Sequence, residues 1–142
     1  MTDVVVTVPQ NRWQEWLAEG ALPGELYPPD VEYYWFGGGA FPRIEPGERV
    51  YVVACGLLRG YAPLVRLETL PEAVRRWCRH EDPTIPAPSS WWWAGSRWAL
   101  VRHGGAVACT IPEPVRGFRG WRYRWWNCAD EHPFPGWKEK IN

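Results

Sequence analysis

The segment from Arg116 to Trp126 contains the residues whose types and spacing most directly suggest a chemistry. It interleaves four arginines with five aromatic residues and two glycines. Aromatic faces stack on nucleobases, and planar guanidinium groups make bidentate contacts with phosphates. Because successive side chains on a strand point to opposite faces, Trp121, Tyr123 and Trp125 should share one face of a strand over 121–126. Arg122, Arg124 and Trp126 should share the other. The segment predicts a nucleic-acid-binding surface; the alternative is that one face fills the core and the arginines stack over exposed rings.

Three consecutive tryptophans, Trp91, Trp92 and Trp93, form a second signal. They cannot all face inward on a strand, so at least one should be exposed or line a groove. Together with Trp35, which precedes a triple glycine, they predict a stacking cage for a flipped or modified base. The alternative is a core packed with tryptophan. The predicted phosphate contacts are Arg59, Arg97, Arg116, Arg119, Arg122 and Arg124, and the predicted stacking residues are Trp35, Trp91, Trp92, Trp93 and Trp121.

Residues suited to metal binding or nucleophilic catalysis are sparse. Cys78-x-His80 and Cys128-x-x-x-His132 supply four soft ligands, but Cys-x-His is at the tight limit of the spacing typical of structural zinc sites. Cys128 and His132 also lack an identifiable third group that would orient them as a nucleophile pair. The adjacent carboxylates at 130–131 diverge on a strand. We therefore expect no catalytic residue, no metal and no cofactor.

The charges of the chain are balanced overall but unevenly distributed. Among 142 residues, 16 are Lys or Arg and 16 are Asp or Glu, which gives a formal net charge of zero and excludes a uniformly basic nucleic-acid binder. Residues 1–50 carry three basic and eight acidic side chains, whereas residues 97–126 carry six basic and one acidic. A neutral protein can therefore present a basic strip, and this one coincides with the interleaved arginines and aromatics.

Length and composition favour one globular domain. The hydrophobic fraction of 46% argues against disorder. No run approaches the roughly 20 apolar residues that a membrane span needs. The four cysteines are widely spaced and the first residues do not resemble a secretory signal. We therefore expect free thiols in a cytoplasmic protein that is not bound to a membrane, either a monomer or a weak homodimer.

Hydrophobic patterning predicts short strands joined by turns rich in proline and glycine. The strands are expected at 3–8, 33–36, 49–54, 58–68, 98–102, 106–111 and 121–126. Two helices are expected, one from Pro9 to Glu19 and one from the Thr69-x-x-Glu72 capping box to about residue 80. Residues 127–142 have the composition of a Pro-rich C-terminal tail. This order of elements is typical of an α+β domain.

Two parts of the predicted hairpin follow a known pattern: Ile44-x-Pro-Gly-Glu-Arg-Val-Tyr-Val-Val and, further on, Leu58-x-Gly-Tyr-Ala-Pro-Leu-Val-Arg66. They resemble a strand start and the following strand in the PUA-like superfamily, especially its ASCH and EVE branches. The resemblance implies a single PUA-like (ASCH/EVE-like) domain over residues 1–142. Its fold would be α+β, a small PUA-like mixed β-barrel of about six or seven strands with two flanking helices.

The resemblance also implies a function. Members of this superfamily commonly bind RNA or DNA, and several branches hold a modified base in an aromatic cage. A few ASCH proteins are enzymes, either ribonucleases or small amidohydrolases that rely on an early lysine and a glutamate. Here the lysines are Lys138 and Lys140, and Glu68 ends a strand, where we expect a solvated side chain. The sequence thus predicts a non-enzymatic module for RNA or DNA, with a modified nucleotide among its candidate ligands. An ASCH-type enzyme and a protein-interaction module using exposed tryptophans are the alternatives.

Overall fold

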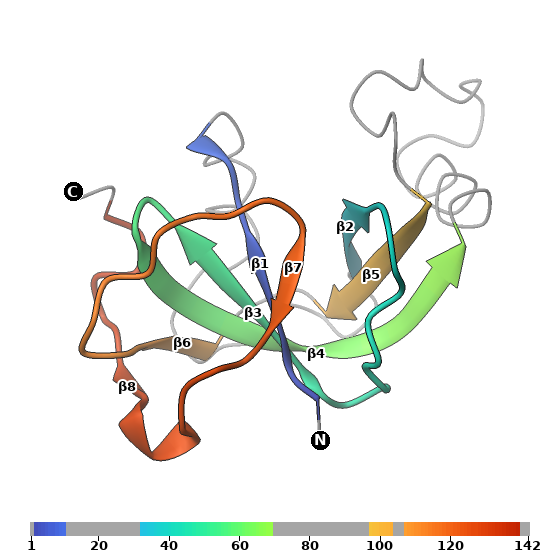
Figure 1. Ribbon diagram of the computed structural model, residues 1–142. Helices are drawn as coiled ribbons and strands as arrows, with labels where there is room; N and C mark the ends of the chain where they lie inside the picture. Colours follow the sequence, from blue (N-terminus) through green and yellow to red (C-terminus); the bar gives the residue numbers. More distant parts are fainter. Residues whose placement is uncertain (1, 11–31, 70–96, 104–106, 140–142) are drawn as a thin grey trace.

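A computed structural model gives the structure of the chain and describes residues 2–10, 32–69, 97–103 and 107–139 (Figure 1). One sheet of eight strands curls into a half-barrel. The strands are β1 (Val4–Thr7), β2 (Glu32–Gly37), β3 (Arg49–Ala54), β4 (Leu57–Thr69), β5 (Trp98–His103), β6 (Val107–Thr110), β7 (Trp121–Tyr123) and β8 (His132–Pro133). The 3-10 turn η3 spans Cys128–Asp130. Among the described residues, no helix has the length and apolar character needed to cross a membrane.

The strand order is β2-β5-β4-β3-β1-β7, and β6 pairs with β4 and with β8. β1 runs parallel to β3, with Val5 opposite Tyr51, and the other pairs are antiparallel. The 13-residue strand β4 pairs with β3 and β6 along its first part and with β5 along its last. The register shifts between Val52 and Val53 and between Leu64 and Arg66. Such irregularities bend a strand, which lets a single sheet curl.

The hairpin between β3 and β4 lies where the sequence predicts it. Cys55 and Gly56 connect the strands with positive φ angles of 49° and 78°. Positive φ at both central residues is typical of a type I′ turn, whose twist matches that of the flanking strands. Glycine is favoured at the second of these positions because it adopts this conformation without strain.

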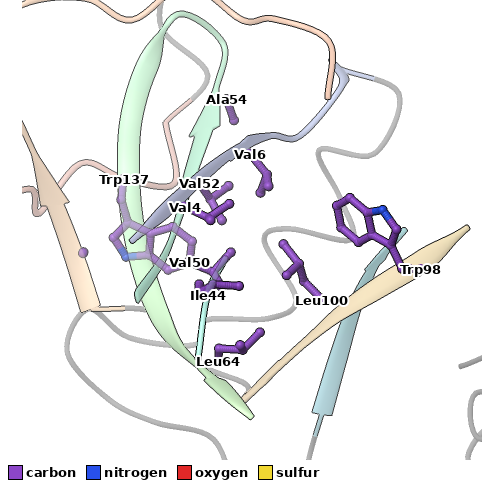
Figure 2. Packing of buried hydrophobic residues seen from close by; sticks show 11 residues of the cluster. Val4, Val6, Ile44, Val50, Val52, Ala54, Leu64, Trp98, Leu100 and Trp137 are labelled. Atoms are coloured by element: carbon purple, nitrogen blue, oxygen red, sulfur yellow. The ribbon is translucent and has the colours of Figure 1, made fainter. Parts of the chain in front are cut away.

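The centre of the sheet is buried on both of its faces. The inner cluster joins valines of β1 and β3 to residues of later strands and of the C-terminal segment (Figure 2): Val4, Val6, Ile44, Val50, Val52, Ala54, Leu64, Trp98, Leu100, Ala108 and Trp137. The outer cluster takes the alternate residues: Val5, Tyr51, Val53, Leu58, Cys109, Ile111, Val115 and Trp126. Burial on both faces explains why β1 and β3 are continuous apolar runs without alternation.

The expected α+β class with two flanking helices is wrong for the part of the chain that the structure describes, which is almost all strand. The two expected helices, over 9–19 and 69–80, lie almost entirely outside the described residues. Within the described residues, the layer over the outer face of β1 and β3 comes from the segment 107–126. Trp137, 1% exposed, packs into the inner cluster. Residues 127–139, which the sequence presents as a tail, are therefore part of the folded domain.

Candidate nucleic-acid interface

The loop over 112–120 is held firmly against the sheet before it enters β7. Val115 is buried in the outer cluster, and its amide donates to the carbonyl of Gly56 at 2.9 Å. The amide of Phe118 donates to the hydroxyl of Thr7 at 3.2 Å. A Cβ at Gly117 would lie 3.1 Å from the Thr7 methyl group, so a glycine permits this close approach. The loop therefore presents its remaining side chains from a fixed backbone.

We call the exposed Arg116, Arg119, Arg122 and Trp125, together with the half-buried Phe118, the arginine–aromatic surface. The Arg122 guanidinium lies over the Phe118 ring, 4.5 Å from its centroid. The Phe118 and Trp125 rings meet edge to face, with centroids 6.1 Å apart and an interplanar angle of 67°. Trp125 is 48% exposed, and the three arginines are exposed as well. The surface thus combines cations with ring faces, the pairing that nucleic acids recognise.

The predicted alternation over 121–126 is wrong beyond Tyr123, where β7 ends. Trp126 turns into the outer cluster, and its indole N–H donates to Glu131 Oε2 at 2.8 Å. The regular strand geometry ends at this turn. Trp125 then contacts the Phe118 ring, over which the Arg122 guanidinium lies. Trp125 therefore lies beside the arginines and not with Trp121 and Tyr123.

Two of the predicted phosphate contacts are used inside the protein. Arg59 is fully buried, and its guanidinium donates to the backbone carbonyls of Ala54, Trp137 and Glu139 at 2.9, 3.3 and 2.6 Å. Arg124 Nε pairs with Asp3 Oδ2 at 3.1 Å. Arg59 cannot reach a ligand, and Arg124 holds the end of β7 to the start of β1. Both predictions are corrected, because a charge count along the sequence does not distinguish paired from exposed arginines.

Arg97 is exposed at the start of β5, where its amide donates to the carbonyl of Gly37 at 2.8 Å. It belongs to a different part of the sheet from the loop 112–120, next to the end of β2. Of the predicted set, Arg116, Arg119 and Arg122 are exposed on the loop 112–120 and on β7, whereas Arg97 lies on another element.

Two tryptophans link the two ends of the sheet through their indole N–H groups, and a third bonds to the loop after β2. Trp35 of β2 donates to the carbonyl of Thr7 in β1 at 3.5 Å, and Trp121 of β7 donates to that of Ala40 at 3.2 Å. Trp98 donates to that of Gly39 at 3.3 Å. β2 and β7 are the two ends of the strand order, so the bonds from Trp35 and Trp121 close the half-barrel where no ladder between described strands joins it. Trp35 and Trp121 are half-buried, which shows that these predicted stacking residues also pack against the inner cluster.

The cage predicted from Trp35 and the 91–93 tryptophans has one described member. The Trp35 ring lies against that of Trp98, with centroids 6.0 Å apart. Trp91, Trp92 and Trp93 lie outside the described residues, as do Cys78 and His80 of the weighed zinc set. Cys128 and His132 are exposed, and among the described residues no three His, Cys, Asp or Glu side chains are grouped as metal ligands would be.

The polar cluster that sequence reasoning missed is centred on Glu131, and we call Arg49, Tyr51, Trp126 and Glu131 the Glu131 network. The Tyr51 hydroxyl donates to Glu131 Oε2 at 2.6 Å, and Arg49 Nη1 lies 3.3 Å from Oε1. Arg49 Nη1 also donates to the Tyr51 hydroxyl at 3.0 Å. With the bond from Trp126, the Glu131 carboxylate has three donors and a side chain 9% exposed. A phenol buried on the outer face of a strand was the available signal, since it requires a partner.

The electrostatics of this region keep its acidic groups protonated or paired. Burial, together with the hydrogen bond to Glu131, raises the pKa of Tyr51 well above its ordinary value. Burial also raises the pKa of the Cys109 thiol to about 12. A thiol held neutral in this way is a poor nucleophile, because the thiolate is the reactive form. The region is therefore suited to structural support and not to covalent chemistry at Cys109.

The curled sheet, with its parallel β1–β3 pair and long bent β4, is similar in fold to solved structures of an ASCH protein. The chain is similar to the crystal structure of an ASCH protein from Zymomonas mobilis, with a TM-score of 0.50 and 9% identity over 90% of each chain. It is also similar to a tyrosine-to-phenylalanine mutant of that protein, with a TM-score of 0.51 and 8% identity over 88% of this chain and 91% of that one. No protein-family model and no curated protein matches the chain. The resemblance predicted from the β3–β4 segment is thus confirmed at the level of the fold.

Proposed function

We propose that this protein binds nucleic acid, RNA or DNA, in single-stranded form through the arginine–aromatic surface. The observation that carries the proposal is the stack of the exposed Arg122 on the half-buried Phe118, with the exposed Trp125 at its edge. A base can lie on such a ring face while a neighbouring guanidinium contacts the phosphate, and neither contact depends on sequence. The likeness to ASCH domain structures supports the proposal through the fold that both share.

The charges of the surface support the same function. Arg116, Arg119 and Arg122 fall within seven residues that include no acidic side chain. Within the described residues, none of the three guanidinium groups has a hydrogen bond or an ion pair with another residue. Their guanidinium donors are directed to solvent, where a phosphate would replace water. By contrast, the equally basic Arg124 is already neutralised by Asp3.

The finer sequence predictions belong to this proposal: a modified base held by Trp35 with Trp91, Trp92 and Trp93, a cytoplasmic location, and a monomer or weak homodimer. The half-buried ring of Trp35 supports the first of these, because its contact with Trp98 holds it rigid. A stacking platform needs a ring that is fixed yet partly accessible. Arg97, near the end of β2, is suited to contact the phosphate of such a nucleotide.

An ASCH-type enzyme is the second candidate, and the burial of Glu68 is the observation that favours it. Glu68 is 4% exposed and forms an ion pair with Arg66, so the expectation of a solvated side chain is wrong. Buried carboxylates are common at active sites, although a paired one also serves structure alone. We expect no turnover of RNA or acetylated cytidine. Turnover that is lost on Glu68→Gln would favour the enzyme.

Fluorescence anisotropy with labelled oligonucleotides of about 12 nucleotides tests the binding function. We expect RNA or DNA to bind the unaltered protein, and Trp125→Ala and Arg122→Gln each to weaken binding about five-fold or more. Lys138→Gln is the control, since Lys138 is exposed but lies over Trp137, on the C-terminal segment. Absence of binding to any single-stranded RNA or DNA, or equal affinity in all four proteins, would refute the proposal.

A further inference from the structure

A second pair of exposed rings lies on the other side of β7 from the arginine–aromatic surface. Phe41 is 52% exposed and Tyr123 is 40% exposed, and we call this pair the second platform. With Trp125, they are the exposed large hydrophobic side chains of the described residues. Exposed aromatic side chains that gather in one part of a surface usually mark a binding site. The arginine–aromatic surface accounts for Trp125 but leaves these two rings without a role.

The backbone beneath the second platform is fixed by aromatic side chains. The Arg43 amide donates to the Tyr123 hydroxyl at 3.0 Å, which ties the loop over 38–45 to β7. Trp121 and Trp98 donate to the carbonyls of Ala40 and Gly39. The Phe41 ring rests against the buried Trp98, with centroids 6.0 Å apart. Phe41 is therefore exposed on an ordered loop, where its ring loses little freedom on contact with a ligand.

The position of β7 places the two platforms around one edge of the sheet. β7 pairs with β1 and ends the strand order, so no strand of the described residues pairs with its other side (Figure 1). Tyr123 contacts Trp121 and the loop over 38–45 on one side. Arg122 contacts Phe118, and through it Trp125, on the other. A flexible chain that crosses this edge meets rings on both sides.

We propose that a single nucleic-acid strand wraps over the β7 edge and stacks bases on both platforms, with Phe118 and Trp125 on one side and Phe41 and Tyr123 on the other. Arg122 and the exposed Arg43 contact the phosphates between them. This inference rests on the proposed function and names its ligand class more narrowly. A duplex keeps its bases stacked on one another and cannot place them on rings that face different directions. The site therefore selects unpaired strands long enough to reach both platforms.

Two sites joined by one ligand strengthen each other through effective concentration, so affinity should depend steeply on length. We expect an RNA of about 12 nucleotides to bind at least about ten-fold more tightly than one of about 3, and than a duplex of the same length. Phe41→Ala should weaken the long strand about five-fold and the short one less than about two-fold. Phe41→Tyr keeps the ring and should restore long-strand affinity, which separates stacking from folding.

The outcomes distinguish this inference from the function on which it rests. If Trp125→Ala and Arg122→Gln weaken the long strand but Phe41→Ala does not, the wrapping path is wrong and the proposed function stands. Equal affinity for duplex and single strand would overturn both the wrapping path and the preference for single strands in the proposed function. If no oligonucleotide binds, both proposals fail, and the second platform becomes a candidate surface for a protein partner.

Discussion

The Glu131 network and the arginine–aromatic surface lie side by side and contain the same residue types. In the network these residues are bonded to one another, whereas on the surface they are exposed. The rings of Trp125 and Trp126 touch, with centroids 5.0 Å apart and an interplanar angle of 86°. On one side of this contact, Trp126 is buried and bonded to Glu131. On the other, Trp125 is exposed beside Phe118. One adjacent pair of tryptophans thus marks the border between a group that stabilises the fold and a group that is available to a ligand.

The arginines show the same division. Burial alone would lower the pKa of Arg49, but its hydrogen bond to Tyr51 and the charges around it raise that pKa above the ordinary value. Its guanidinium is committed to Glu131 and lies over the Tyr61 ring at 4.1 Å. Arg122 also lies over a ring but has no described acidic partner. The presence of a carboxylate partner, and not the arginine–ring contact, therefore separates a structural arginine from one that is available to a ligand.

The largest expected effect is on the free energy of unfolding, and it distinguishes a buried tryptophan from an exposed one. Trp137→Ala removes a side chain that is 1% exposed in the inner cluster, and we expect a loss of about 3–5 kcal/mol in the free energy of unfolding. Trp125→Ala, at a half-exposed position, should cost less than about 1 kcal/mol. Urea denaturation of both variants measures the difference. A loss below about 1 kcal/mol for Trp137→Ala would show that the C-terminal segment is not part of the core.

A somewhat smaller effect is expected at the centre of the network. Glu131→Ala leaves the buried donors of Tyr51 and Trp126 without their acceptor, and we expect a loss of about 2–4 kcal/mol. Glu113→Ala is the matched control, since Glu113 is an exposed carboxylate on the loop 112–120. Thermal unfolding checks both. Equal stability of the two variants would mean that the network contributes nothing to the fold.

Sequence patterns were sufficient to locate most of the sheet. Seven of the strands lie where turn residues and apolar runs predict them, because those signals act between near neighbours in the chain. β8 was missed, since its two residues pair with Cys109 and Thr110 and carry no pattern of their own. The covering of β1 and β3 by later segments was missed for the same reason: continuous apolar runs show burial on both faces but not what provides it.

The candidate site was predicted in part. Arg116, Arg119 and Arg122 are exposed, and Arg122 lies over the Phe118 ring, as the interleaved pattern suggests. Arg59 and Arg124 were misassigned, because their partners at Glu139 and Asp3 are distant in sequence. The same distance hid the contact between Tyr51 and Glu131. Composition predicts which residues are available for a site, whereas tertiary contacts decide which of them are used internally.

Two variants in the segment 122–124 compare an arginine that is paired with a carboxylate with one that has no described acidic partner. Arg124→Gln leaves Asp3, whose side chain is 7% exposed, without its ion pair, and we expect a loss of about 1–3 kcal/mol in stability. Arg122→Gln should change stability by less than about 0.5 kcal/mol while weakening oligonucleotide binding. Denaturation and anisotropy on the same two proteins measure both quantities. A greater stability loss for Arg122→Gln than for Arg124→Gln would reverse the assignment of the two residues.

The smallest effect concerns the buried thiol. The pKa of Cys109 is about 12 in the folded protein, against an ordinary value of about 8.5 in the unfolded chain. The folded state therefore keeps this proton up to a higher pH than the unfolded chain does. Its contribution to stability is complete below about pH 8.5 and decreases as the pH rises towards about 12. When the pH rises from about 7 to about 9, the free energy of unfolding of Cys109→Ala should fall by about 1 kcal/mol less than that of the unaltered protein. Equal pH dependence would show that the thiol is not protected by burial.

Salt dependence of binding tests the central claim most directly, that the three exposed arginines contact phosphates. For single-stranded RNA, three neutralised phosphates contribute about −2 to the slope of a plot of the logarithm of the association constant against that of salt concentration. The variant with Arg116, Arg119 and Arg122 all changed to Gln should bind more weakly and show a slope that is shallower by about 2. An unaltered protein whose binding does not depend on salt, or a triple variant with the same slope, would contradict the account.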